Sequence, residues 1–197
     1  MAPLADAHLT VTEAMEVWLG ENFNVHGEQV RVLYDKPPLM FQPTSIEEQH
    51  ELFRRLDLVE KQFVFTGEKH LVFHHDNIED ILEETVFTQC IRKSDGKTSI
   101  RLRKDRPALL VSSTSWTPDE DFSILLEALK ELDKTIKAKS DDGKKDTIFP
   151  KVLVIVTGKG PQKSYYLPLL KDFNATHPSI NIQTLWLEAG DYPKLLG

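Results

Sequence analysis

The sequence lacks the features that would place a protein in a membrane, in an oxidising compartment or on a nucleic acid. Its single cysteine, Cys90, cannot form an internal disulfide, and no Cys/His cluster has the spacing of a zinc site. The longest apolar run, Val152–Val156, is far shorter than the roughly 20 residues of a membrane-spanning helix. Met1–Asp6 contains no basic side chain and no apolar stretch, so it does not read as a signal peptide.

Basic residues are in deficit as well. The chain has 24 Lys and Arg against 31 Asp and Glu, a net charge of −7, which argues against a broad nucleic-acid-binding surface. With 40% hydrophobic and 28% charged residues, the composition is that of an ordinary globular protein. A length of 197 residues corresponds to one domain, or to one domain plus a fragment of another. Together these properties predict a soluble, reduced, intracellular protein.

Residues 1–38 read as strand, helix and strand. The apolar run Ala7–Val11 is followed by Thr12, a suitable cap for a helix over Glu13–Glu21. A second β-rich run, Val30–Tyr34, precedes the pair Pro37-Pro38, which ends regular structure because proline fixes φ and removes a donor. We interpret this segment as the tail of one domain and its junction with the next.

Residues 39–106 have a different character. Ser45, with Glu48 three residues later, forms the capping-box pattern of a helix that extends to Leu56. From Phe63 to Lys104 the periodicity is weak, which predicts a long mobile excursion from the domain. Residues 92–106 carry seven basic and two acidic side chains. This basic stretch could contact phosphates or anionic lipid head groups, but we favour pairing with the acidic residues of 41–91, or simple solvation.

Residues 107–197 follow a regular alternation of strands and helices. Apolar runs predict three buried strands, and helical spacing predicts helices that begin near Thr117 and Gln162. Lys137–Lys145 reads as a surface loop, and a further helix begins at Asp191 shortly before the sequence stops. The order βαβαβ is that of half of a doubly wound nucleotide-binding domain, so the chain looks like a fragment. The predicted strands are Ala108–Ser112, Lys151–Thr157 and Ile180–Trp186.

Hydroxyl side chains gather at the end of the first of these strands. Ligands of open α/β sheets bind at the carboxyl ends of the strands, and a helix N-terminus suits a phosphate. The candidates for phosphate contact are Ser112, Ser113, Thr114 and Ser115, for which structural and binding roles are equally open. Thr117 and Glu120 have the spacing of a second capping box, so we assign Asp119, Glu120 and Asp121 mainly to helix initiation.

The loops after the other two strands supply further candidates. Gly158, Lys159, Gly160 and Pro161 follow the second strand, where glycines permit close approach of a ligand and a lysine can reach an anion. This pattern is neither a P-loop nor the dinucleotide fingerprint. Trp186, at the end of the third strand, could line a base pocket, although a place in the core is the more frequent role for such a residue.

Taken together, the three loops resemble one known family, the chitobiosyldiphosphodolichol beta-mannosyltransferases. The long run with Ser-Ser-Thr-Ser-Trp-Thr is the most specific part, and the resemblance is weakest over 63–106. The runs that carry it are Ala108–Phe122, Val156–Pro161 and Trp186–Pro193, with Leu4–His8, Val11–Met15 and Val32–Pro37 near the start.

The resemblance implies a glycosyltransferase with two Rossmann-like domains (the GT-B fold), of which this chain holds part. Residues 1–38 would end the acceptor-side domain, 39–106 would hold a helix and the excursion, and 107–197 would begin the nucleotide-sugar domain. The reaction would transfer the first mannose from GDP-mannose to dolichol-diphosphate chitobiose with inversion. It would take place at the cytosolic face of the endoplasmic reticulum, in the lipid-linked pathway of N-glycosylation, with no cofactor or metal.

The resemblance also implies roles for individual residues. By their positions, Ser112–Ser115 and Gly158–Pro161 would face the donor diphosphate, and Trp186 and Leu187 would lie toward the guanine. Other mannosyltransferases of the pathway are implied as partners, and nucleic acid is not. Membrane contact would be made through segments that this sequence does not contain. An inverting transferase needs a general base, and the sequence indicates none. Two alternatives therefore stay open: an inactive product of the same family that binds nucleotides or partners, and an unrelated nucleotide-binding α/β protein.

Overall fold

The computed structural model describes residues 5–56, 58, 80–141 and 149–197. The chain divides into two compact units, Met1–Phe41 and Gln42–Gly197, and the division falls just past Pro37-Pro38. Among the described residues, no helix combines the length and the apolar character needed to cross a bilayer.

The first unit is a single βαβ element. Strands β1 (His8–Thr10) and β2 (Val30–Val32) pair in parallel, and they are joined by α1 (Glu13–Phe23) and the short 3-10 helix η2 (Gly27–Gln29). The hydroxyl of Thr12 accepts a hydrogen bond from the Met15 backbone, which confirms the predicted cap. The helix ends at Asn24, whose left-handed backbone is a common helix terminus.

The centre of the second unit is a three-stranded parallel sheet, which confirms the predicted βαβαβ order. Its strands are β6 (Ala108–Ser113), β7 (Val152–Thr157) and β8 (Ile180–Leu185), in the spatial order β6-β7-β8. All six residues of β7 are buried. A parallel strand flanked by two others and covered on both faces is expected to be apolar throughout, which explains its unbroken valine- and leucine-rich sequence.

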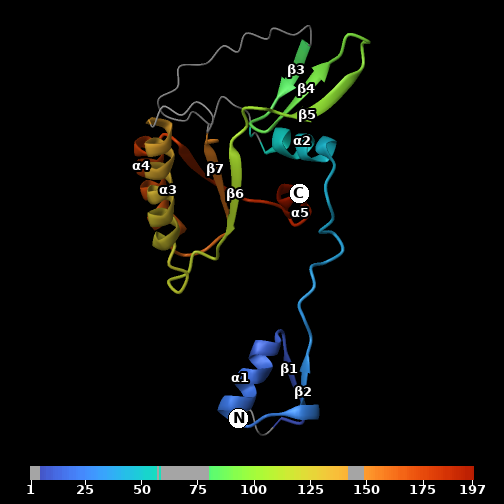
Figure 1. The fold of residues 1–197 in the computed structure, drawn as a ribbon, viewed down its shortest axis with the longest axis vertical. Coiled ribbons are helices and arrows are strands. Elements are labelled where there is room, and N and C mark those ends of the chain that lie inside the picture. Colours follow the sequence, from blue (N-terminus) through green and yellow to red (C-terminus); the bar gives the residue numbers. More distant parts are fainter. Residues whose placement is uncertain (1–4, 57, 59–79, 142–148) are drawn as a thin grey trace. The chain divides into compact units, whose positions relative to one another are not determined.

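Helices cover both faces of this sheet (Figure 1). Val152, Val154 and Val156 pack with α3 (Ser123–Asp141) and α4 (Lys163–Thr176). Leu153 and Ile155 point to the opposite face, where α2 (Ile46–Arg55) and α5 (Tyr192–Leu196) pack. The two-residue period of the strand therefore divides the hydrophobic core into two clusters.

The helix α2 begins as the sequence predicts. The Ser45 hydroxyl accepts a hydrogen bond from the Glu48 backbone, and the Glu48 carboxylate accepts one from the Ser45 backbone, both at 3.3 Å. This reciprocal pair satisfies two helix-end donors that would otherwise lack partners. Leu52 and Phe53, on the inner side of α2, are buried against the sheet.

The prediction of a long excursion over 63–104 is wrong where the structure describes it. Strands β3 (Asp80–Glu84), β4 (Thr88–Arg92) and β5 (Thr98–Leu102) form an antiparallel sheet, and Ser94–Gly96 belongs to the turn between the last two. Residues 59–79, which include Thr66-Gly67, a dipeptide typical of a turn, lie outside the described residues.

Polar burial explains why periodicity missed this sheet. Thr85 and Thr88 are fully buried, and their hydroxyls lie 2.7 Å apart. The Nδ1 of His50, on α2, lies 2.7 Å from the Thr88 hydroxyl, so a hydrogen-bonded chain joins the helix to the sheet. In the basic stretch, Arg103 is also buried, and it donates to the Thr85 carbonyl oxygen and to the Asp105 carboxylate. Hydrophobic alternation cannot reveal a sheet whose contacts with α2 and with its own connecting residues are made by buried Thr, His and Arg side chains.

Two predicted boundaries around α3 are also wrong. The helix begins at Ser123 and not near Thr117, because Thr117–Glu120 forms a separate turn and the Asp121 carboxylate accepts from the Ser123 backbone. It then continues to Asp141, so the first part of the predicted loop Lys137–Lys145 is helical. Burial of Ile136 in the core and the ion pair Asp133–Lys137 hold this charged final segment in the helix.

Candidate functional site

Two of the three predicted loops pack directly against each other at the carboxyl ends of β6 and β7. A β-carbon added at Gly158 would lie 1.8 Å from the Thr114 carbonyl oxygen, and one added at Gly160 would lie 1.6 Å from that of Ser115. Gly158 also has φ +120°, a conformation that favours glycine. The two glycines are therefore needed for the approach of one backbone to another, whatever ligand the edge binds.

The hydroxyl loop after β6 is organised by Glu120. Its carboxylate accepts hydrogen bonds from the Thr114 hydroxyl and, at 2.7 Å, from the Ser115 backbone. These bonds, the Thr114 bond first among them, hold the pKa of Glu120 below its usual range. The Thr114 oxygen in turn accepts from the Trp116 backbone at 3.0 Å. Thr114 thus shapes the loop. Glu120 stabilises the same loop and does not form the capping box that its spacing from Thr117 predicts.

The remaining hydroxyl residues lie closer to solvent. Ser113 and Ser115 are exposed, and the Ser115 hydroxyl lies 3.1 Å from that of Thr117. Ser112 is half-buried within β6, and its carbonyl oxygen accepts from the Thr157 hydroxyl. Of the four candidates in this run, Ser113 and Ser115 present side chains that a ligand can reach.

We expect Thr114→Val to lower the free energy of unfolding by about 1–2 kcal/mol, because the backbone N–H of the buried residue Trp116 would lose its acceptor, the Thr114 hydroxyl. Ser113→Ala, at an exposed neighbouring position, is the matched control and should change stability by less than about 0.5 kcal/mol. Urea denaturation followed by circular dichroism measures both. Equal losses in the two variants would contradict a structural role for the Thr114 hydroxyl.

The tryptophan of the hydroxyl loop belongs to the core. Trp116 is 1% exposed and packs against Phe122 and Tyr166, with ring centroids 4.7 Å and 5.8 Å away. Its φ of +52° is rare for a bulky residue. The turn into this conformation sends the ring beneath α3 and α4, while the preceding serines stay at the edge. Trp116, the most distinctive residue of the predicted motif, therefore fixes the loop to the hydrophobic core.

Trp186, by contrast, lies outside the core, so the core assignment favoured from the sequence is wrong. Its side chain is 58% exposed, and the Lys159 ammonium lies 3.8 Å from the ring centroid, in a cation–π contact. Lys159 and Pro161 are both exposed on the loop after β7. Leu187, the neighbour of Trp186, is buried with Leu153 and Ile155 and packs in the core.

Several residues at this edge were missed by sequence reasoning. Lys163 reaches the Gly158 carbonyl oxygen at 3.5 Å, and the Tyr192 hydroxyl lies 3.5 Å from that of Thr157. Asp191 is buried and forms a two-pronged ion pair with Arg55 of α2, in which Nη1 donates to Oδ2 at 3.0 Å. The Arg55 hydrogen bonds are the main cause of a lowered pKa at Asp191. No local pattern could have revealed a pair so far apart in sequence.

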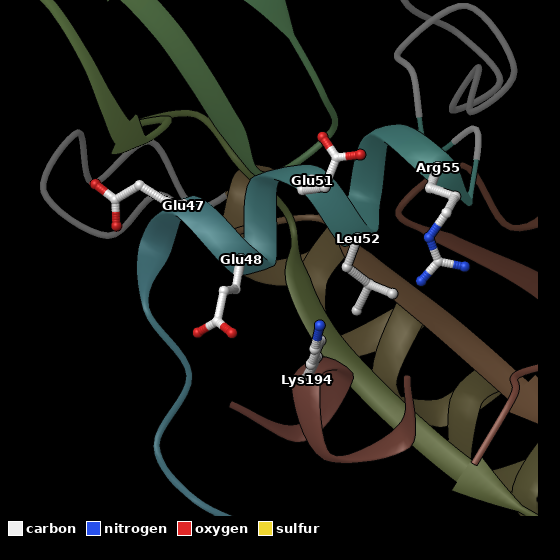
Figure 2. Close-up of a pocket in the computed structure, with 6 residues that line it drawn as sticks. All are labelled: Glu47, Glu48, Glu51, Leu52, Arg55 and Lys194. Atoms are coloured by element: carbon white, nitrogen blue, oxygen red, sulfur yellow. The ribbon is translucent and has the colours of Figure 1, made fainter. Parts of the chain in front are cut away.

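A hollow of about 280 Å³ lies elsewhere, between α2 and α5 (Figure 2). Three of its charged side chains already have partners: Glu48 binds Ser45, Glu51 binds Arg54, and Arg55 binds Asp191. None of the residues predicted for the site lines it. Its lining consists of Glu47, Glu48, Glu51, Leu52, Arg55 and Lys194. Within the described ranges, no group of three or more His, Cys, Asp or Glu side chains is arranged to hold a metal ion.

Comparison with known proteins supports the resemblance found in the sequence. The chain is 40% identical over 200 residues to the UDP-glycosyltransferase TURAN of Arabidopsis thaliana, covering 98% of this chain and 40% of that protein. It is 37% identical over 194 residues to the chitobiosyldiphosphodolichol beta-mannosyltransferase of Homo sapiens, and 39% over 194 residues to that of Mus musculus. These alignments cover 98% of this chain and 37% and 36% of the relatives.

No family model and no solved structure matches the chain. The chain spans no more than about 40% of the length of these curated relatives. Within that span, the alignments run through both structural units and the three loops at the sheet edge. Over nearly its whole length, the chain is thus a homologue of the chitobiosyldiphosphodolichol beta-mannosyltransferases.

Proposed function

We propose that this chain supplies the donor-binding part of a mannosyltransferase that uses GDP-mannose and acts, with inversion, on dolichol-diphosphate chitobiose. The observation that carries the proposal is the edge formed by Ser113, Ser115, Lys159 and Trp186, which presents hydroxyls, an ammonium and an indole ring together. The homologues named for this acceptor support the same assignment. The reaction would occur at the cytosolic face of the endoplasmic reticulum, alongside other mannosyltransferases of the pathway.

The edge has the chemistry that a nucleoside diphosphate requires. The exposed hydroxyls of Ser113 and Ser115 can donate to phosphate oxygens, and the ammonium groups of Lys159 and Lys163 can offset the diphosphate charge. The indole of Trp186 offers a flat apolar surface on which a base can stack. The close packing of Gly158 and Gly160 against the hydroxyl loop fixes the backbone that carries Lys159 relative to the backbone that carries Ser115. Such preorganisation lowers the entropic cost of binding.

The test is nucleotide binding by the purified chain. We expect GDP to raise its melting temperature, with a stabilisation of about 2.7 kcal/mol at a concentration one hundred times the Kd. UDP and ADP, at the same concentrations, should stabilise it less. One relative is named a UDP-glycosyltransferase, so tighter binding of UDP than of GDP would assign a different donor. Absence of stabilisation by every nucleotide would overturn the proposal.

A second assay separates an enzyme from an inactive binding module. The chain is incubated with GDP-[14C]mannose and a dolichol-diphosphate chitobiose analogue, and the lipid product is extracted and counted. We expect transfer to need residues that the relatives carry outside the aligned span, because no general base is assigned in the described part of this chain. Nucleotide binding without transfer by a chain extended to the length of the relatives would favour the inactive module.

A further inference from the structure

The starting point is the fixed backbone around Lys159. Gly158 and Gly160, on either side of it, lie against the carbonyl groups of Thr114 and Ser115 with no room for a β-carbon. The Lys163 ammonium also reaches the Gly158 carbonyl oxygen, at 3.5 Å. The Cα of Lys159 is therefore held in place, while its side chain is exposed. Exposed side chains exchange rotamers rapidly, on timescales of nanoseconds or less.

The backbone that carries Trp186 is held in place as well. The next residue, Leu187, is buried in the core, and the loop ends at Asp191, which Arg55 binds through two hydrogen bonds. The indole is nevertheless 58% exposed, and the Lys159 ammonium covers one of its faces at 3.8 Å from the centroid. The Lys159 ammonium thus occupies the space that a base would need in order to stack on that face of the ring.

We infer that the Lys159 ammonium moves from the Trp186 ring to the diphosphate when a nucleotide binds. This exchange makes the indole face selective for bases that carry a diphosphate. Without a ligand, the ammonium occupies the indole face. A nucleoside diphosphate then makes two contacts, because its base takes the indole face and its diphosphate takes the displaced ammonium. A charge-assisted bond to phosphate is stronger than an exposed cation–π contact, so the exchange favours the diphosphate ligand. A nucleoside without phosphate displaces the ammonium and gives it no new partner.

This inference rests on the proposed donor site, and it predicts effects of opposite sign. Lys159→Ala should weaken GDP binding about tenfold, because the diphosphate loses its cation. The same variant should bind guanosine up to about threefold more tightly, because the indole face is already free. Lys159→Arg should keep GDP affinity within about threefold, since the charge remains. Lys171→Ala, an exposed lysine on α4, is the control and should leave both affinities unchanged.

Isothermal titration with GDP and guanosine measures these affinities, and melting temperatures confirm that each variant is folded. Weaker guanosine binding by Lys159→Ala would overturn the inference, because it would show that Lys159 supports the base instead of competing with it. Equal, unchanged binding of both ligands would overturn it too.

A probe without a base distinguishes failure of this inference from failure of the donor site. Inorganic pyrophosphate should draw the Lys159 ammonium away from the ring and so change the fluorescence of Trp186. The signal is assigned to Trp186 if it disappears in Trp186→Phe. The change should be absent in Lys159→Ala. A pyrophosphate response without any nucleotide binding would show that the ammonium leaves the ring for phosphate, but it would reject the donor site and, with it, the selectivity for nucleotides. Nucleotide binding with no response to pyrophosphate, or with the same response in Lys159→Ala, would reject the exchange and keep the donor site.

Discussion

Replacing Gly160 by alanine is expected to lower the free energy of unfolding of the unit Gln42–Gly197 by about 3 kcal/mol or more. The new β-carbon would lie 1.6 Å from the Ser115 carbonyl oxygen and 2.9 Å from the Trp116 β-carbon. Neither group can move aside alone, because the Trp116 carbonyl accepts from the Gln162 backbone and its ring is buried in the core. The two loops would have to separate, and the packing beneath α3 and α4 would be disturbed.

The matched control for this substitution is Gly190→Ala. Gly190 lies on the loop after β8, and a β-carbon there would meet no atom within 4 Å. Its substitution should change stability by no more than about 0.5 kcal/mol. Urea denaturation at neutral pH, followed by far-ultraviolet circular dichroism, gives both values. If Gly160→Ala proved as mild as Gly190→Ala, the close packing of the two loops would be disproved.

Arg55→Met is expected to cost on the order of 2 kcal/mol of stability. Asp191 keeps only 9% of its side chain exposed, so loss of the guanidinium leaves a buried carboxylate without its main partner. The expected loss is below the range for a fully buried pair, because 48% of the Arg55 side chain is exposed to solvent. The pair joins α2 to the start of α5, so local unfolding of the final helix should also increase.

Arg54→Met, one residue earlier on α2, provides the control. Arg54 pairs with Glu51 on the helix surface, and both side chains are at least half exposed. Surface pairs of this kind contribute little to stability, because both charges stay hydrated and are screened by salt. Thermal and urea denaturation of both variants make the comparison, with hydrogen exchange of the α5 amides as a local readout. Equal losses in the two variants would show that burial of Asp191 adds nothing to the pair.

The same pair predicts how stability depends on pH. Hydrogen bonds from Arg55 are the main cause of a folded-state pKa for Asp191 below that of the unfolded chain. A lowered carboxyl pKa contributes stability that is fully present above the unfolded value of about 3.9, and is lost as the pH falls through the folded value. We therefore expect the stability difference between the original chain and Asp191→Asn to shrink below about pH 4. A difference that stayed constant down to pH 2 would contradict this coupling.

Local signals explain the elements that the sequence predicts well. The strand β7 is a run of apolar residues, and a strand buried on both faces requires no more than that. The start of α2 depends on Ser45 and Glu48, which lie within one helical turn of each other. The predicted set of residues at the sheet edge follows from the same logic, because the carboxyl ends of parallel strands lie side by side.

Interactions between distant residues explain the failures. Glu120 has the spacing of a capping residue, but it binds Thr114 and Ser115 because the backbone turns at Trp116. The sheet of β3–β5 is joined to α2 by a buried chain of hydrogen bonds from His50 to Thr88 and Thr85, and no apolar period marks its strands.

The sequence by itself thus determined the order βαβαβ, the start of α2 and the family resemblance, because each depends on residues close together in the chain. Only the tertiary structure decided which of two tryptophans, each near the end of a strand, is buried and which is exposed. Trp116 is 1% exposed because a left-handed turn directs it beneath two helices, whereas Trp186 is 58% exposed beside Lys159. The structure also decided the pairing of Arg55 with Asp191, since burial selects a partner by its position in space and not by its distance along the chain.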